Sequence, residues 1–208
     1  MAVPGFRQWQ RSNHARTALW AALDLESSSQ AFRPLAHPDR AAHDAGDIVR
    51  LWELDAQSGA FRREYAYPLD PPASFQRDCA AGPVARNDIK ISELCCLPDG
   101  SLLVLERVTL STHIHRIRPD VAQALPPAYV EPAHRPTLEQ VGQSGAAAAG
   151  IALLHKEPVF STDAHPEIGG DLEGMLWLDD GSLLLANDND YGIEGAATRF
   201  WLAVGPLS

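Results

Sequence analysis

The sequence predicts an all-β protein built from short antiparallel strands, and three observations support this fold class. Fifteen glycines and sixteen prolines among 208 residues suit many turns between short elements. Short apolar runs bounded by turn residues recur along most of the chain, and four of these runs belong to the two copies of an internal repeat. With 45% hydrophobic and 21% charged residues, the chain is able to bury a core.

The repeat aligns residues 91–105 (ISELCCLPDGSLLVL) with residues 172–186 (LEGMLWLDDGSLLLA) without a gap. Each copy contains an apolar run, a turn with an Asp-Gly pair, and a second apolar run that begins with Ser-Leu-Leu. An Asp-Gly pair between apolar runs is a strong hairpin signal, because glycine adopts positive φ without steric cost. The sequence therefore predicts two equivalent β-hairpins.

The remaining strands are predicted from apolar alternation between turn residues. The segment Thr17–Leu25 is ambiguous, because its alanines and leucines favour a helix, whereas its position before the next pair of strands favours a strand. Residues 26–46 and 119–149 are predicted to be loops, the second one flexible and peripheral. The predicted strands outside the hairpins are Thr17–Leu25, Asp47–Asp55, Phe61–Leu69, His113–Ile117, Ile151–Phe160 and Thr198–Val204.

Counted along the chain, these strands form groups of three, four and three, and four strands are the content of one propeller blade. We therefore predict a partial β-propeller of about two to three four-stranded antiparallel blades, in a single domain over residues 1–208. Residues 1–46 form a poorly defined lead-in and residues 47–205 the blades. A closed ring needs roughly four to eight blades, so the ring is expected to be incomplete. A fragment of a longer protein is favoured over assembly with another copy or self-association through open sheet edges.

Charge and composition restrict the partners. A formal net charge of −10 disfavours binding to nucleic acid or to an anionic membrane surface, and favours cations. The sequence contains no run of 18 apolar residues, so it predicts no membrane-spanning helix. Residues 1–10 are followed by Arg11, His14 and Arg16 rather than by an apolar segment, so the sequence as written predicts no signal peptide and a cytoplasmic location. The three cysteines, Cys79, Cys95 and Cys96, are too few and too clustered for a disulfide framework, and Cys95 and Cys96 are predicted to be small apolar core residues.

A candidate metal site follows the second hairpin, where Asn187, Asp188 and Asp190 leave an apolar strand. Ca²⁺ prefers six to eight oxygen ligands, which carboxylate and amide side chains supply. Arg199 stands where an EF-hand would place its bidentate glutamate, so that motif is excluded. The alternative is an Asx-rich turn that ends the strand.

Glu173 begins the same hairpin, at a position where a strand would normally carry an apolar residue. Antiparallel pairing would place it near Asn187 and Asp188, so we add Glu173 to the candidate metal ligands. The alternative is a surface cluster of solvated charges.

The first hairpin has a similar arrangement, with Glu93 at its start and Glu106 and Arg107 at its end. These three residues are the candidate catalytic residues. Arg107 is suited to hold a phosphate oxygen bidentately, or else it neutralises Glu93 or Glu106 in a structural ion pair.

Two histidines offer a further candidate site. His113 and His115 share one face of a strand, where they could bind a transition metal or act as a general base, but a solvated strand face is the more usual explanation. The segment around Ser144 lacks the spacing of a nucleophile elbow, and no nucleotide-binding glycine motif is found.

Four segments resemble a known family, the phytase-like β-propeller domain described as having esterase-like activity. The resemblance covers residues 47–205 and extends only to the carboxy-terminal half of the family domain. It implies a secreted or periplasmic propeller that hydrolyses small-molecule phosphoesters or other esters, with Ca²⁺ as a cofactor. The segments are RLWELDAQSGAFRREYAYPLD (50–70), ISELCCLPDGSLLVLER (91–107), DLEGMLWLDDGSLLLANDNDYG (171–192) and TRFWLAV (198–204), with Lys156 before a further apolar strand.

Three functional hypotheses follow. In the first, the chain is a metal-dependent hydrolase of phosphate or other esters, in which Glu93 or Glu106 acts as base and Arg107 stabilises the substrate anion. In the second, it is a non-catalytic propeller that binds calcium or a partner through the same residues. In the third, it is an inactive truncated fragment.

Overall fold

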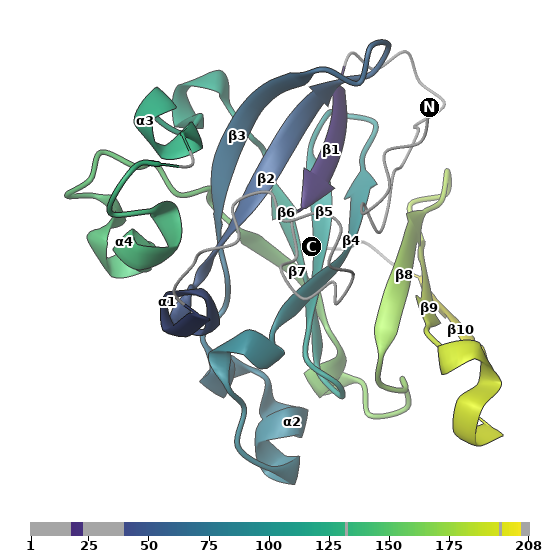
Figure 1. Ribbon diagram of the computed structural model, residues 1–208. Coiled ribbons are helices and arrows are strands. Elements are labelled where there is room, and N and C mark those ends of the chain that lie inside the picture. The colour runs from purple at the N-terminus through teal and green to yellow at the C-terminus, as the bar shows by residue number, and fades with distance from the viewer. Residues whose placement is uncertain (1–17, 23–39, 132, 196, 205–208) are drawn as a thin grey trace. The chain divides into compact units, whose positions relative to one another are not determined.

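The computed structural model describes residues 18–22, 40–131, 133–195 and 197–204, and its strands form three antiparallel sheets (Figure 1). They confirm the predicted all-β class, as a partial β-propeller whose sheets have three or four strands. The chain divides into two compact units, the first formed by Met1–Pro71 with Arg118–His155 and the second by Pro72–Ile117 with Lys156–Ser208. The assignment of a single domain to residues 1–208 stays a prediction.

The first unit contains the three-stranded sheet β1-β2-β3, as predicted. Its strands are β1 (Ala18–Ala22), β2 (Ile48–Asp55) and β3 (Phe61–Pro68). The turn between β2 and β3 is stabilised by Asp55, whose carboxylate accepts backbone N–H bonds from Gln57 and Ser58. Gly59 ends this turn with a φ of 69°, a conformation that glycine adopts at no steric cost.

The prediction of a flexible peripheral loop over residues 119–149 was wrong. This segment forms helices, and α4 begins with a capping box in which Thr137 and Gln140 exchange side-chain and backbone hydrogen bonds. Leu138 and Ala146 are buried in the core of the first unit together with Ile48. The helical elements of this unit are α1 (Arg40–Ala45), η3 (Val121–Gln123), α3 (Pro127–Val130) and α4 (Leu138–Ala146).

The prediction of a loop over residues 26–46 was also wrong for Arg40–Ala45, the segment that forms α1, and residues 26–39 lie outside the described part of the chain. No helix in the described ranges is long and apolar enough to cross a membrane.

The second unit contains a four-stranded sheet in the order β4-β5-β6-β7 and a three-stranded sheet in the order β10-β9-β8. The strands are β4 (Lys90–Cys96), β5 (Leu102–Arg107), β6 (Thr112–Ile117), β7 (Glu157–Ser161), β8 (Leu172–Trp177), β9 (Leu183–Asn187) and β10 (Phe200–Ala203). The helical elements are η1 (Pro72–Ser74), α2 (Gln76–Ala81), η2 (Arg86–Asp88), η4 (Thr162–Ala164) and η5 (Asp190–Gly195).

The predicted strand over residues 151–160 forms only in its second half, as β7. Ile151 and Leu154 instead belong to the first unit, where Ile151 joins the core and the Leu154 N–H donates to the carbonyl of Ala66 on β3.

The two predicted hairpins form with the same turn geometry. In β4–β5 the N–H of Leu97 donates to the carbonyl of Ser101 over 2.9 Å, and in β8–β9 the N–H of Leu178 donates to Ser182 over 2.9 Å. The glycine of each turn has positive φ, 88° in the first hairpin and 83° in the second. The repeated sequence therefore encodes a repeated structure.

One face of the four-stranded sheet packs in the apolar core of the second unit, and the other, the polar face, carries buried polar side chains next to apolar ones such as Leu102 and Val104. Leu105 and Ile114 are paired across β5 and β6, and they pack with Met175 of the other sheet in the core of the second unit. Glu106 and His113 are also paired, and side chains of successive residues on a strand point to opposite faces. They therefore lie on the face opposite the apolar one.

Candidate functional site

Both hairpins of the second unit contain a β-bulge near the start of their first strand. In β4 the pairing shifts between Ile91 and Glu93, so that Ser92 is the extra residue. In β8 the shift lies between Leu172 and Gly174, so that Glu173 is the extra residue. The two extra residues occupy equivalent positions of the repeat. A bulge re-aims the side chain that it carries, and here both side chains reach the same arginine.

That arginine is Arg107, at the end of β5. Its guanidinium Nε donates to the Ser92 hydroxyl over 2.9 Å, Nη1 donates to the Val108 carbonyl over 2.8 Å and to Asp171 Oδ1 over 3.1 Å, and Nη2 donates to Glu173 Oε1. Arg107 is buried, whereas the Asp171 and Glu173 side chains are 49% and 23% exposed. The buried arginine thus pairs with two carboxylates that are partly exposed to solvent.

Asp171 is fixed through its backbone as well as through its side chain. Its φ is +52°, an uncommon value for a residue other than glycine. Its N–H donates to the Thr109 carbonyl over 2.6 Å, and its carbonyl accepts the N–H of Asp188 over 2.9 Å. Gly170 permits this approach, because a Cβ at that position would lie 2.4 Å from the Thr109 oxygen. Asp171 therefore lies between the end of β9 and the β5–β6 turn.

The candidate metal ligands at the end of β9 have different surroundings. Asn187 holds the following loop together: its Oδ1 accepts the N–H of Arg199 over 2.6 Å, and its Nδ2 donates to the carbonyls of Asp188 and Ala197. This matches the turn-forming alternative. Asp188 is exposed beside Asp171, and the side chain of Asp190 lies outside the described part of the chain. The assignment of these residues to a metal stays a prediction.

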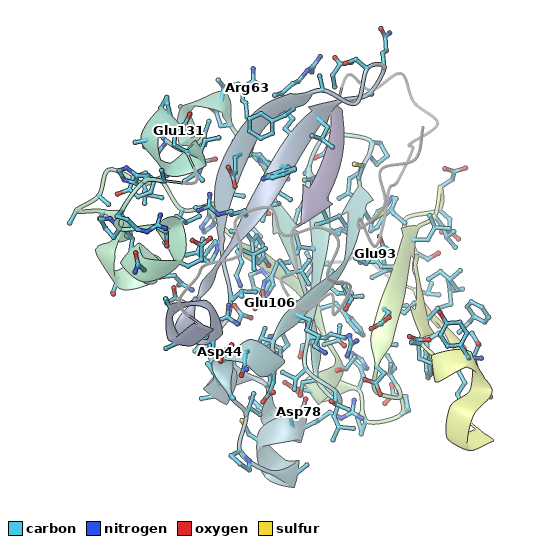
Figure 2. All side chains as sticks on the ribbon, viewed as in Figure 1. Asp44, Arg63, Asp78, Glu93, Glu106 and Glu131 are labelled. Carbon is cyan, nitrogen blue, oxygen red and sulfur yellow. The ribbon has the colours of Figure 1, made fainter. Side chains whose placement is uncertain are left out.

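Glu106 is completely buried on the polar face of β5 (Figure 2). Its Oε2 atom lies 2.9 Å from Nζ of Lys156 and 3.9 Å from Nε2 of His115. A buried carboxylate requires such partners, because an isolated charge loses its hydration without compensation. Lys156, which the sequence analysis names only as part of the family resemblance, is therefore an ion-pair partner of Glu106.

His113 and His115 are both buried, at 8% and 7% exposure, so the solvated-face explanation was wrong. His113 stacks on Phe75, and its Nε2 lies 3.2 Å from Asp163 Oδ2. Asp163 also accepts the Ser111 hydroxyl over 2.6 Å. Burial by itself would raise the pKa of Asp163, but the hydrogen bonds from Ser111, His113 and the N-terminal N–H groups of α2 lower it.

Asp78 of α2 fixes the β5–β6 turn (Figure 2). Its buried carboxylate accepts the backbone N–H groups of Thr109, Leu110 and Ser111, at distances of 2.7 to 3.1 Å. This turn precedes β6, which carries His113 and His115, and its Thr109 carbonyl accepts the N–H of Asp171. Asp78 therefore fixes the loop that lies between the Arg107 cluster and the two histidines.

Glu93 is buried at 6% exposure on β4, next to the bulge (Figure 2). Burial raises its pKa to about 7, although N–H bonds from Leu94 and Met175 act in the opposite direction. No Lys or Arg among the described residues forms a salt bridge with it. A carboxyl group with this pKa exchanges protons near neutral pH, as a general acid or base requires.

Of the seven residues predicted from the sequence, Arg107 and Glu173 are in direct contact, and Asp188 lies beside Asp171, which also pairs with Arg107. Glu93 follows the bulge at Ser92. Glu106 precedes Arg107 on β5, so its side chain points to the opposite face of the sheet, where it pairs with Lys156. The sequence interpretation missed Asp171, although the Asp-x-Glu spacing with Glu173 was a usable signal. It also missed Asp163, whose contact with His113 depends on the fold of residues distant in sequence.

Comparison with known proteins gives one match. A family model described as Phytase-like, esterase-like activity of phytase, matches residues 15–191. No curated protein and no solved structure matches the chain. Because the matched region spans most of the sequence and contains both hairpins and the Arg107 cluster, the chain belongs to the phytase-like family of proteins with esterase-like activity.

Proposed function

We propose that the protein hydrolyses esters of small molecules, phosphate esters among them, at the end of the second unit where Arg107 holds Asp171 and Glu173. The observation that carries the proposal is this buried arginine beneath two partly exposed carboxylates. Membership in the phytase-like family supports the reaction class.

The proposal gives the three candidate catalytic residues different roles. Glu93 acts as the general acid or base, because its pKa of about 7 lets it accept and return a proton at neutral pH. Arg107 positions the two exposed carboxylates, since each of its guanidinium nitrogens already donates to a protein acceptor. Glu106 has no direct part in the reaction, because it is fully buried and paired with Lys156 on the face of β5 opposite to Arg107.

A hard cation such as Ca²⁺ fits the exposed side of this cluster. Asp171, Glu173 and Asp188 offer carboxylate oxygens, the donor type that Ca²⁺ prefers, and the first two are partly exposed. Asn187 fits less well, because its side-chain oxygen already accepts an N–H. When bound, such an ion lowers the pKa of a coordinated water. The chain contributes the fixed positions of the carboxylates and the proton exchange at Glu93.

Turnover assays test the proposal. The purified protein is incubated with p-nitrophenyl acetate, p-nitrophenyl phosphate and phytate, with Ca²⁺ and with EDTA. We expect turnover of at least one substrate, and a decrease in kcat/KM of roughly a hundredfold for Glu93→Gln, since general acid–base catalysis contributes at least that factor. Asp179→Asn is the control, because it removes an exposed carboxylate at the opposite end of the second hairpin. Equal rates for Glu93→Gln and the wild type would remove Glu93 from the mechanism.

A second candidate function is calcium binding without catalysis. The observation in its favour is that Glu173 and Asp171 are already ion-paired with Arg107, which gives the cluster a structural role. A ligand that binds only the native state raises its melting temperature. A Ca²⁺-dependent rise in Tm without turnover of any of the three substrates would favour this function.

A further inference from the structure

Asp78 lies on α2 (Figure 2), and its side chain is hydrogen-bonded to the backbone of one short turn. The buried carboxylate accepts four hydrogen bonds from three consecutive N–H groups, those of Thr109, Leu110 and Ser111. Hydrogen bonds to an ionised acceptor are roughly twice as strong as bonds between neutral groups. Successive N–H groups that converge in this way bind anions, and here the anion is the protein's own carboxylate. Asp78 therefore fixes the main chain of the turn.

The same turn fixes the backbone of Asp171. The Thr109 carbonyl accepts the N–H of Asp171, and the close approach at Gly170 brings the two main chains into contact. The turn also supplies the Val108 carbonyl, which accepts Nη1 of Arg107 over 2.8 Å, and this nitrogen donates to Asp171 Oδ1 as well. A shift of the turn would therefore move Asp171 and an acceptor of its arginine together.

Arg77 precedes Asp78 on α2 and supports the chain that leads into Asp171. Its Nη1 donates to the Ile168 carbonyl over 3.1 Å, and Ile168 belongs to the core of the second unit. Its backbone N–H donates to the Ser111 hydroxyl over 3.1 Å. Two adjacent residues of α2 thus hold both the turn that receives Asp171 and the segment that precedes it.

Asp171 depends strongly on such support. Its φ of +52° is a conformation that costs energy in residues other than glycine and persists only where the surrounding structure imposes it. Its side chain is 49% exposed, so apolar packing contributes little to its position. The hydrogen bonds to the β5–β6 turn and to Arg107 therefore determine where its carboxylate lies relative to Glu173.

We propose that α2, through Asp78 and Arg77, positions Asp171 for the reaction at the ester-hydrolysing site. This inference rests on the proposed function, in which Asp171 and Glu173 are the partly exposed carboxylates that suit a hard cation. Asp78 is a positioning residue and not a ligand, because both of its carboxylate oxygens accept N–H groups of the turn. Replacing residues that orient a metal ligand from behind commonly lowers metal affinity by roughly 10- to 100-fold.

Amide hydrogen exchange, followed residue by residue by NMR, tests the positioning without a substrate. Asp78→Asn keeps the shape of the side chain but turns an NH2 group towards the N–H groups of the turn. We expect the Asp171 and Asp188 amides, which donate to the Thr109 and Asp171 carbonyls, to exchange at least roughly tenfold faster than in the wild type. Unchanged exchange at both amides would overturn the proposal.

Asp163→Asn is the matched control for this measurement. The Asp163 side chain is only 10% exposed and also accepts N–H groups of α2, together with the Ser111 hydroxyl and a contact from His113. Its bonds reach the Ser111 side chain and not the main chain of the turn, so this variant should lose stability while both amides stay protected. Equal acceleration in Asp163→Asn and Asp78→Asn would show general loosening of the fold and would count against the proposal.

Arg77→Gln tests the same role of α2 at a partly buried position, where a substitution is less disruptive to folding than at Asp78. The variant loses the bond to the Ile168 carbonyl, and we expect the Asp171 amide to exchange at least roughly threefold faster than in the wild type. Exchange equal to that of the wild type would contradict the proposed role of α2.

The calcium dependence of turnover connects this positioning to the proposed function. With Asp171 displaced in Asp78→Asn, we expect half-maximal turnover to require roughly tenfold more Ca²⁺, with rates that approach the wild type at saturating Ca²⁺. A purely structural role would lower the rate by the same factor at every Ca²⁺ concentration, and that result would refute the positioning role. If the wild type turns over none of the three substrates, the proposed function fails, and the exchange of the Asp171 amide then decides alone whether α2 positions this residue.

Discussion

The two hairpins of the repeat have the same turn, the same bulge position and similar apolar runs, but their strand ends carry different chemistry. The first hairpin ends in Glu106 and Arg107, where the second ends in Asn187 and Asp188. The first provides the buried cation and a buried acid, and the second provides an exposed carboxylate. The turn and apolar positions therefore build the same scaffold in both hairpins, whereas the strand ends carry different side chains that complement one another.

Removing the shared arginine is the strongest way to break this relationship. Arg107→Gln leaves Asp171 and Glu173 without their cation, and we expect the free energy of unfolding to fall by about 3 kcal/mol, as for other broken buried pairs. Urea denaturation measures the loss. Arg116→Gln is the control, because Arg116 pairs with Asp99 at the exposed turn and should cost less than about 1 kcal/mol. Equal losses in the two variants would contradict a central role for Arg107.

Equivalent leucines sharpen the comparison. Leu103 of the first hairpin is 1% exposed and lies in the core of the second unit, whereas its equivalent Leu184 lies on the half-buried outer face. Leu103→Ala is expected to cost about 2–5 kcal/mol, the range for a buried leucine. Leu184→Ala should cost clearly less in the same urea denaturation. A larger loss of unfolding free energy for Leu184→Ala than for Leu103→Ala would mean that Leu184, and not Leu103, lies in the core.

The third comparison concerns pH, because Glu93 is replaced by Gly174 in the second hairpin. The folded-state pKa of about 7 exceeds the ordinary value of 4.5, so the stabilisation from this group is complete below pH 4.5 and is lost as pH rises through 7. Melting temperatures measured between pH 5 and pH 8 should fall more steeply in the wild type than in Glu93→Gln. Between pH 5 and pH 8, the wild type should lose about 2 kcal/mol more unfolding free energy than Glu93→Gln. Parallel pH profiles would show that Glu93 keeps its ordinary pKa.

The turn acids should show the smallest effect and the closest agreement between the hairpins. Asp99 and Asp180 each accept the N–H and hydroxyl of the serine two residues later. Hydrogen bonds to Ser101 outweigh desolvation and lower the pKa of Asp99 to about 2, and those to Ser182 lower the pKa of Asp180. Asn substitution at either position should lower Tm slightly at pH 7, with the loss shrinking as pH falls from 4 towards 2. A lower Tm for one Asn variant and a higher Tm for the other would contradict the equivalence of the two turns.

The hairpins, the strand order and the grouping of strands into sheets could be predicted from the sequence because each depends on local signals. An Asp-Gly turn and an apolar alternation act within about ten residues. Asp171 depends on a bulge and on the docking of the β5–β6 turn, which no local pattern reveals. The burial of His113 likewise depends on Phe75 and Asp163, which come from distant segments. Helix α4 was within reach of the sequence, since Thr137 and Gln140 form a recognisable capping box.

Gly170 has a consequence for engineering this protein. Since any side chain there would collide with the carbonyl of Thr109, the spacing between the loops on either side depends on an atom that glycine lacks. A library that randomises Asp171 and Glu173 while retaining this glycine would vary the chemistry without moving the backbone beneath it. Randomising Gly170 as well would mix altered specificity with altered geometry, and the two could no longer be separated by selection.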